Sequence, residues 1–190
     1  MSKSNNTPND AKIASAALHL AGTKGWAKVS LEGVAKATRV PLATLAKRFT
    51  NASALIPLIA AEIDRDAFKT VGKTAGTPHD ILFDLLMARF DNLQKHRKAI
   101  LSMSEVARHD RLLTCALARA TLEGVYRVIA AARLSKPSRP VLAIGLSTIY
   151  GWAFLAWRRD QSRDLAPTMA ALDRALRLAT RILAFLEQKA

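Results

Sequence analysis

The chain has 190 residues, of which half are hydrophobic and 23% are charged, a composition that is typical of a globular protein and excludes a disordered one. Lys and Arg total 29 against 15 Asp and Glu, and the formal net charge of +14 favours a polyanionic partner, either nucleic acid or an acidic membrane surface. A basic surface that only keeps the protein soluble is the alternative interpretation.

The positive charge is concentrated toward the ends of the chain. Residues 1–50 contain eight basic and two acidic side chains and thus hold +6 of the +14. The single cysteine, Cys115, excludes an internal disulfide and a cysteine-based zinc site, and its apolar neighbours predict that it is buried. The first ten residues are polar, and the longest uncharged run, 140–157, is shorter than the roughly 20 apolar residues that span a bilayer. The sequence therefore predicts a cytoplasmic protein with no integral membrane segment.

Helical periodicity predominates and strand patterns are nearly absent, so the sequence predicts an all-α fold of about nine helices. Thr7 and Ser30 are expected to cap the first two helices, and Gly25 to end the first. The segments 72–78, 135–140 and 160–167 predict loops. In chain order the expected helices are 8–24, 31–37, 41–48, a helix from 51 or 53 to about 71, then 79–95, 97–108, 110–133, 141–159 and 167–188.

Three short helices joined by tight turns in the first 50 residues predict a helix-turn-helix module. Such a module needs a small residue where its last two helices cross, which Ala35 supplies. It also needs apolar residues that pin one helix over the other: Val34, Val40 and Leu45. Lys47 and Arg48 fall at the end of the expected recognition helix, where basic groups reach DNA phosphates.

Residues 13–56, IASAALHLAGTKGWAKVSLEGVAKATRVPLATLAKRFTNASALI, resemble the TetR family of bacterial regulators. The resemblance is carried by the apolar first helix and by residues at the family spacing: Gly25, Trp26, Ser30, Val34, Ala35, Val40, Thr44, Leu45, Phe49 and Leu55. It implies a DNA-binding module over 1–52, a helical ligand-binding and dimerisation domain over 53–190, and a homodimer formed through the last two helices. It also implies a transcriptional regulator whose partners are double-stranded DNA and a small apolar effector.

The sequence departs from the family pattern at several DNA-contacting positions. Arg39 stands in place of a turn glycine, Pro41 in place of serine or threonine, Ala46 in place of a phosphate-touching tyrosine, and Ala52 in place of a lysine. Leu42 and Ala43 offer no hydrogen bonds to base edges, which leaves them only apolar contact with a thymine methyl. The DNA-binding candidates that the resemblance implies are Lys28, Ser30, Arg39, Leu42, Thr44, Lys47 and Arg48.

A second resemblance points to another function. Residues 79–101 and 164–179 are similar to a bacterial branch of TetR-like proteins that includes the lipid-binding accessory protein of ubiquinone biosynthesis. This resemblance implies an isoprenoid or lipid pocket and a helix-turn-helix that no longer reads DNA. A TetR-fold lipid-binding accessory protein is therefore the alternative function.

Apolar residues of the C-terminal half fit a ligand pocket. Phe83, Met87 and Phe90 recur at i, i+4 and i+7 on one helix face, and Trp152 and Leu155 lie in a helix that is apolar almost all round. Such a helix has to be buried on all sides, within the domain or across a dimer. These five residues are the predicted effector pocket, and an ordinary core is the alternative. The last helix carries two apolar stripes for core and partner: Met169, Leu172, Leu176, Leu183 and Leu186, and Ala171, Ala175, Leu178, Ile182 and Phe185.

Patterns that indicate catalysis are missing from the sequence. His19, His79, His96 and His109 fall in different expected helices without metal-ligand spacing. No phosphate-binding glycine loop and no Ser/His/Asp arrangement is recognisable. The sequence predicts a protein that is not an enzyme, with no catalytic residue, no metal and no cofactor.

Overall fold

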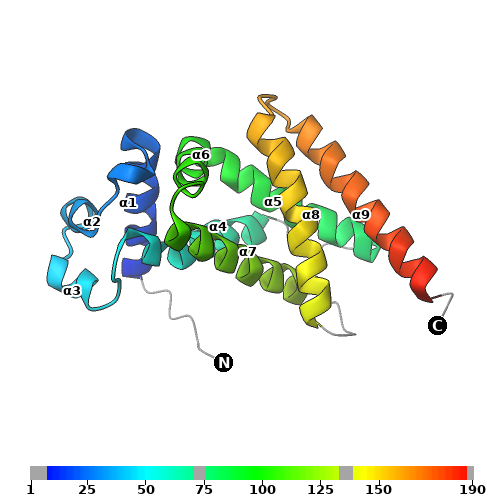
Figure 1. The fold of residues 1–190 in the computed structure, drawn as a ribbon, viewed down its shortest axis with the longest axis horizontal. Coiled ribbons are helices and arrows are strands. Elements are labelled where there is room, and N and C mark those ends of the chain that lie inside the picture. Colours follow the sequence, from blue (N-terminus) through cyan, green and yellow to red (C-terminus); the bar gives the residue numbers. More distant parts are fainter. Residues whose placement is uncertain (1–7, 71–75, 133–138, 188–190) are drawn as a thin grey trace. The chain divides into compact units, whose positions relative to one another are not determined.

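The computed structural model describes residues 8–70, 76–132 and 139–187, and within these ranges the chain is helical and contains no strand (Figure 1). The all-α prediction is therefore confirmed. The α-helices are α1 Pro8–Lys24, α2 Leu31–Thr38, α3 Leu42–Ala46, α4 Ile56–Thr70, α5 Pro78–Lys95, α6 Arg97–Val106, α7 Arg111–Ala131, α8 Arg139–Arg159 and α9 Ala166–Glu187. Two short 3₁₀ helices, η1 Trp26–Lys28 and η2 Ala52–Leu55, precede α2 and α4.

Most predicted helices match the observed ones to within two residues at each end. The exception is the fourth helix, which starts at Ile56 because the residues expected in its first turn form the 3₁₀ helix η2. The loops expected at 72–78 and 135–140, and the expected cap at Thr7, fall largely outside the described residues.

The chain divides into two compact units. Unit 1 comprises Met1–Asp66 and Asn92–Thr121, and unit 2 comprises Ala67–Asp91 and Leu122–Ala190. Unit 1 thus holds α1, α2, α3 and α6, whereas unit 2 holds α8, α9 and most of α5.

Unit 1 is built around α1, which contacts α2, η1 and α6. The buried stripe of α1 repeats with helical period and consists of Ile13, Ala14, Ala17, Leu18 and Ala21. Ser102 of α6 fixes the corner after α1, because the Trp26 backbone N–H donates to its Oγ at 3.2 Å and the Ala21 carbonyl lies 3.3 Å from the same atom. Gly25 makes this corner possible with a φ of 81°, a value that favours glycine.

Unit 2 is built on α8 and α9, which pack along each other. The buried stripe of α8 consists of Ala143, Leu146, Tyr150, Ala153 and Trp157. Phe90 of α5 stacks on Tyr150 with 4.8 Å between ring centroids, and the buried Arg89 guanidinium lies 4.5 Å from the Tyr150 centroid. A Cβ at Gly124 of α7 would lie only 2.3 Å from Arg89 Nη2, so glycine at 124 makes room for this guanidinium.

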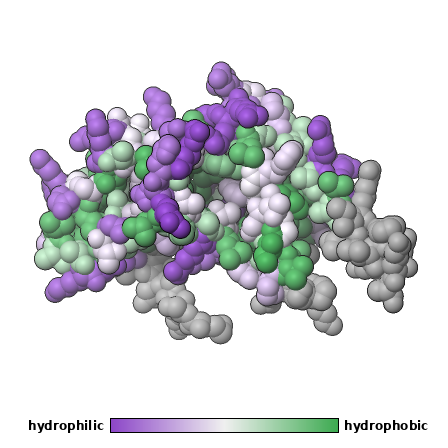
Figure 2. Space-filling model, viewed as in Figure 1, coloured by the Kyte–Doolittle hydropathy of each residue, from purple (hydrophilic) through white to green (hydrophobic). Residues whose placement is uncertain are grey.

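The opposite face of α8 is exposed. Figure 2 shows green, hydrophobic atoms among pale ones at the surface where α8 runs. The exposed large apolar side chains of α8 are Val141, Ile144, Trp152 and Leu155. The segment Pro140–Arg159 is also long and apolar enough to cross a membrane by length and composition alone, a test that core helices of water-soluble proteins pass as well. The expectation that α8 is covered on all sides is thus not met within a single described chain.

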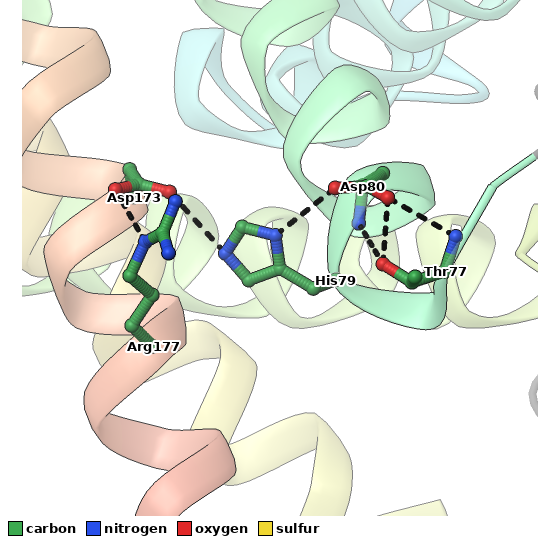
Figure 3. A network of polar contacts seen from close by, with 5 residues as sticks. All are labelled: Thr77, His79, Asp80, Asp173 and Arg177. Atoms are coloured by element: carbon green, nitrogen blue, oxygen red, sulfur yellow. Dashed lines mark hydrogen bonds and ion pairs between the residues drawn. The ribbon is translucent and has the colours of Figure 1, made fainter.

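A polar network ties the start of α5 to α9 (Figure 3). Thr77 and Asp80 form a capping box, since the Thr77 N–H and hydroxyl donate to Asp80 Oδ2 at 3.1 and 2.7 Å and the Asp80 N–H donates to Thr77 Oγ1. The hydrogen bonds from Thr77 hold the pKa of Asp80 below its usual value. His79 Nε2 lies 3.3 Å from Asp173 Oδ1, and Asp173 accepts from Arg177 Nε at 2.8 Å.

Cys115 is exposed, so the prediction that it is buried is wrong. The buried side chain in this turn of α7 is Leu113. Two residues along an α-helix correspond to about 200° around its axis, which turns Cys115 away from the core.

Asp160 holds the loop before α9. Its Oδ1 accepts from the Ser162 N–H at 2.9 Å, and its Oδ2 accepts from the Thr168 N–H at 3.1 Å and the Thr168 hydroxyl at 2.6 Å. Burial raises the pKa of Asp160, but the hydrogen bonds from Ser162 and Thr168 outweigh burial and hold the pKa below its usual 3.8. The ionised carboxylate therefore stabilises the folded state above about pH 3.8, and this stabilisation is lost as the pH falls through the lowered pKa.

Asp160→Asn is expected to lower the free energy of unfolding at pH 7 by about 1–3 kcal/mol, because an amide N–H₂ would face groups that are themselves donors. The difference from wild type should shrink as the pH falls below 3.8 and through the lowered pKa of Asp160, because the wild-type carboxyl then becomes protonated too. Urea unfolding followed by circular dichroism at pH 7 and pH 3 measures the loss of stability at pH 7 and its decrease at low pH. Asp164→Asn is the matched control, since Asp164 is exposed and, among the described residues, accepts a single hydrogen bond, from the Ala166 N–H at 3.2 Å. Equal stability of Asp160→Asn and wild type at pH 7 would contradict this assignment.

Candidate nucleic-acid interface

The helix-turn-helix is formed by α2 and α3 of unit 1. Ser30 caps α2 as predicted, because the Gly33 N–H donates to its Oγ at 3.1 Å. Val34, Ala35 and Leu45 are buried, as residues that hold the two helices together need to be. The remaining expected pinning residue, Val40, lies in the turn and is half-buried.

The turn between α2 and α3 is stabilised at Arg39 and Thr38. Arg39 has φ 57° and ψ 28°, so it adopts the left-handed conformation that a glycine takes at lower cost. The buried Thr38 hydroxyl donates to the Val34 carbonyl at 2.7 Å, and its oxygen accepts from the Val40 N–H at 3.4 Å. Thr38 was not predicted as a module residue, although a threonine in the last helical turn has this i−4 bond as a local option.

Pro41 is the N-cap of α3, and its carbonyl accepts from the Thr44 N–H at 2.9 Å. Leu45 is its buried residue, and the remaining α3 side chains are exposed together with Lys47 and Arg48. Leu42 is 40% exposed, a large fraction for a leucine in a folded unit. The short helix therefore presents a mainly apolar surface with one basic residue, Lys47, directly after it.

An ion pair joins the end of this module to the start of α1. Arg48 Nη1 lies 2.7 Å from Asp10 Oδ1, and the Arg48 guanidinium lies 5.0 Å from the centroid of the Phe49 ring. Asp10 is 4% exposed, whereas the Arg48 side chain keeps 43% of its surface. Arg48, a predicted phosphate contact, thus has a second role, because it fastens the residues after α3 to α1.

A double-mutant cycle with Asp10→Asn and Arg48→Gln should give a coupling energy of about 1 kcal/mol, because one partner of the pair is almost fully buried. The coupling should fall with added salt, since Arg48 is partly exposed. Urea unfolding of the four proteins measures it. The pair Arg108–Glu105, 3.1 Å apart with both side chains about 60% exposed, is the matched control and should couple by less than about 0.5 kcal/mol. A coupling energy at Asp10–Arg48 no larger than that of the control pair would refute the role of Arg48 in attaching the residues after α3 to α1.

The seven DNA-binding candidates are all exposed and all lie in unit 1, around α2 and α3. Lys28 and Ser30 precede α2, Arg39 follows it, and the other four belong to α3 or the residues after it: Leu42, Thr44, Lys47 and Arg48. Their contacts with DNA remain a prediction. Within the described residues, no three His, Cys, Asp or Glu side chains gather as they would around a metal ion.

The five predicted pocket residues are not brought together. Met87 and Phe90 are buried in unit 2, and Phe83 is half-buried and stacks on His79. Trp152 and Leu155 lie on the exposed face of α8 and are therefore corrected to surface positions. The aromatic side chain that α8 turns toward Phe90 is Tyr150, two residues before Trp152 and so about 200° around the helix from it.

No protein-family model matches the sequence, and no curated protein matches it. Several solved structures do match over almost the whole chain. A TetR transcriptional regulator from Nitrosomonas europaea is 26% identical, with 92% of this chain and 99% of that chain covered and a TM-score of 0.69. A TetR transcriptional regulator from Rhodococcus sp. RHA1 is 18% identical, with 90% and 94% covered and a TM-score of 0.68. A TetR-family regulator from Syntrophomonas wolfei is 12% identical, with 93% and 97% covered and a TM-score of 0.62.

Proposed function

We propose that this chain, which has the TetR fold, is a homodimeric transcriptional regulator. It binds operator DNA through the module 1–52 and a small apolar effector in the domain 53–190. The observation that carries this proposal is the helix-turn-helix, whose α3 is held by the buried Leu45 and presents its other side chains to solvent. The +6 charge of residues 1–50 supplies the attraction to phosphates.

The exposed face of α8 supports the homodimer. Val141, Ile144, Trp152 and Leu155 recur along this helix at near-helical spacing, and in α9 Met169 and Leu178 are exposed as well. In a two-fold symmetric dimer the same face of both copies meets, so one apolar face covers the other. This pairing would also explain why α8 is apolar almost all round.

The effector is proposed to bind in unit 2 beside the α5 residues Phe83, Met87 and Phe90, with Tyr150 in place of Trp152 and Leu155. An effector that binds one dimer arrangement better than another shifts the population toward it and so changes DNA affinity. The protein would act in the cytoplasm, where its DNA is. The lipid-binding accessory function is not favoured, because the structural neighbours are transcriptional regulators.

The test is binding of the purified full chain to the DNA that flanks its own gene, compared with a random duplex of equal length. We expect a nanomolar dissociation constant for the flanking DNA and a loss of about 10³–10⁵ in affinity between 50 and 200 mM salt if six to ten phosphates are contacted. Two half-sites about 34 Å apart should be protected in footprinting, one for each protomer. Equal affinity for the random duplex would overturn the proposal.

A further inference from the structure

The surface that α3 offers to DNA is poor in hydrogen-bonding groups. Around the helix axis, Ala43 and Lys47 each lie two residues from the buried Leu45, so both point about 200° away from the core. Leu42 lies in the first turn of α3, Ala46 lies at the side of the helix, and both are exposed. Of these four residues only Lys47 has a polar side-chain atom. Pro41, which precedes them, has no backbone N–H to donate.

Base edges in the major groove offer hydrogen-bond donors and acceptors and, on thymine, one apolar group at C5. The residues at the start of a recognition helix are those that reach base edges. At the start of α3, the side chains of Leu42 and Ala43 can recognise only an apolar group. Thr44 has both a hydroxyl and a methyl, so it can contact a hydrogen-bonding group or an apolar group of a base. Lys47 lies one turn later, and as a flexible point charge it suits phosphates.

Basic residues nearby do not replace the missing base contacts. The Arg48 guanidinium is engaged by Asp10 at 2.7 Å, and Arg39 lies in the turn before α3 with its backbone in a left-handed conformation. Both positions favour contact with phosphates, which fixes the module on the duplex without reading the sequence.

We infer that the protein selects its operator mainly through the C5-methyl groups of thymines in the major groove, with Leu42 and Ala43 as the specificity-determining residues. This inference rests on the proposed function. Burial of one methyl group against an apolar side chain corresponds to about fourfold in affinity. A dimer that buries one thymine methyl in each half-site should therefore lose about 15-fold in affinity when both are removed.

The experiment begins with selection of bound duplexes from a random library, followed by synthesis of the enriched site with thymine or with deoxyuridine. Deoxyuridine keeps every hydrogen-bonding atom of thymine and lacks only the methyl. We expect the dissociation constant of the full chain to rise by about 15-fold or more for the deoxyuridine duplex. Leu42→Ala should reduce this ratio by weakening binding to the thymine duplex alone.

Lys47→Ala is the matched control on the same helix. It should weaken binding to both duplexes equally and reduce the slope of log affinity against log salt by about 1. If an enriched site is bound equally well with thymine and with deoxyuridine, the inference is wrong while the proposed function stands. If no sequence is enriched and all duplexes bind alike, the proposed function fails, and the inference fails with it.

Discussion

Trp152→Glu is expected to convert the protein from a dimer into a monomer at micromolar concentration. Trp152 is 65% exposed in the single chain and lies on the apolar face of α8 between Ile144 and Leu155. A tryptophan at the centre of an interface commonly contributes about 2 kcal/mol or more, and two-fold symmetry places the substitution in both protomers. About 4 kcal/mol corresponds to a roughly 1,000-fold rise in the dimer dissociation constant.

Sedimentation velocity over a range of concentrations measures this dissociation constant. Loss of the dimer should also remove most of the affinity for a two-half-site operator, because each monomer then binds one half-site alone. Leu112→Glu is the matched control: Leu112 is 68% exposed on α7 and lies apart from α8 in the chain, so the dimer should persist. A dimer that survives Trp152→Glu unchanged would show that subunits meet elsewhere.

Local signals explain why the helix-turn-helix could be predicted from the sequence. The Ser30 cap, the spacing of Val34 and Ala35, and Leu45 one turn after Pro41 are all short-range patterns, and all are found as expected. The sequence showed only that Arg39 stands where the family has a turn glycine. The structure shows that Arg39 adopts the left-handed conformation, which arginine takes at a cost that tertiary packing has to offset.

Contacts between distant segments could not be predicted. The pair Asp10–Arg48 and the bonds of Ser102 to the corner after α1 join residues about 38 and 76–81 positions apart, and no periodicity encodes them. The spacing of apolar residues also fails to predict the buried face of a helix that is apolar all round, because every face of such a helix could pack on the core. That is why Trp152, instead of Tyr150, was expected beside Phe90.

Leu45→Ala is expected to destabilise unit 1 by about 2–5 kcal/mol and to abolish operator binding. Leu45 is completely buried and is the buried side chain of α3, so its truncation leaves a cavity between α3 and the rest of the module. A helix of five residues has too few internal hydrogen bonds to persist without such packing. The recognition surface would then lose its fixed geometry, and with it any preference for one DNA sequence.

Leu42→Ala separates this effect from recognition, because it makes the same chemical change three residues earlier on an exposed position. Its free energy of unfolding should stay within about 0.5 kcal/mol of wild type, as for most surface substitutions, while its preference for thymine methyls falls. Urea unfolding and titration of the selected operator distinguish the two variants. Full-strength operator binding by a destabilised Leu45→Ala protein would mean that α3 is not the element that reads DNA. The two variants thus test two separate roles of α3, because Leu45 is proposed to set where the helix lies and Leu42 to contribute to what it recognises.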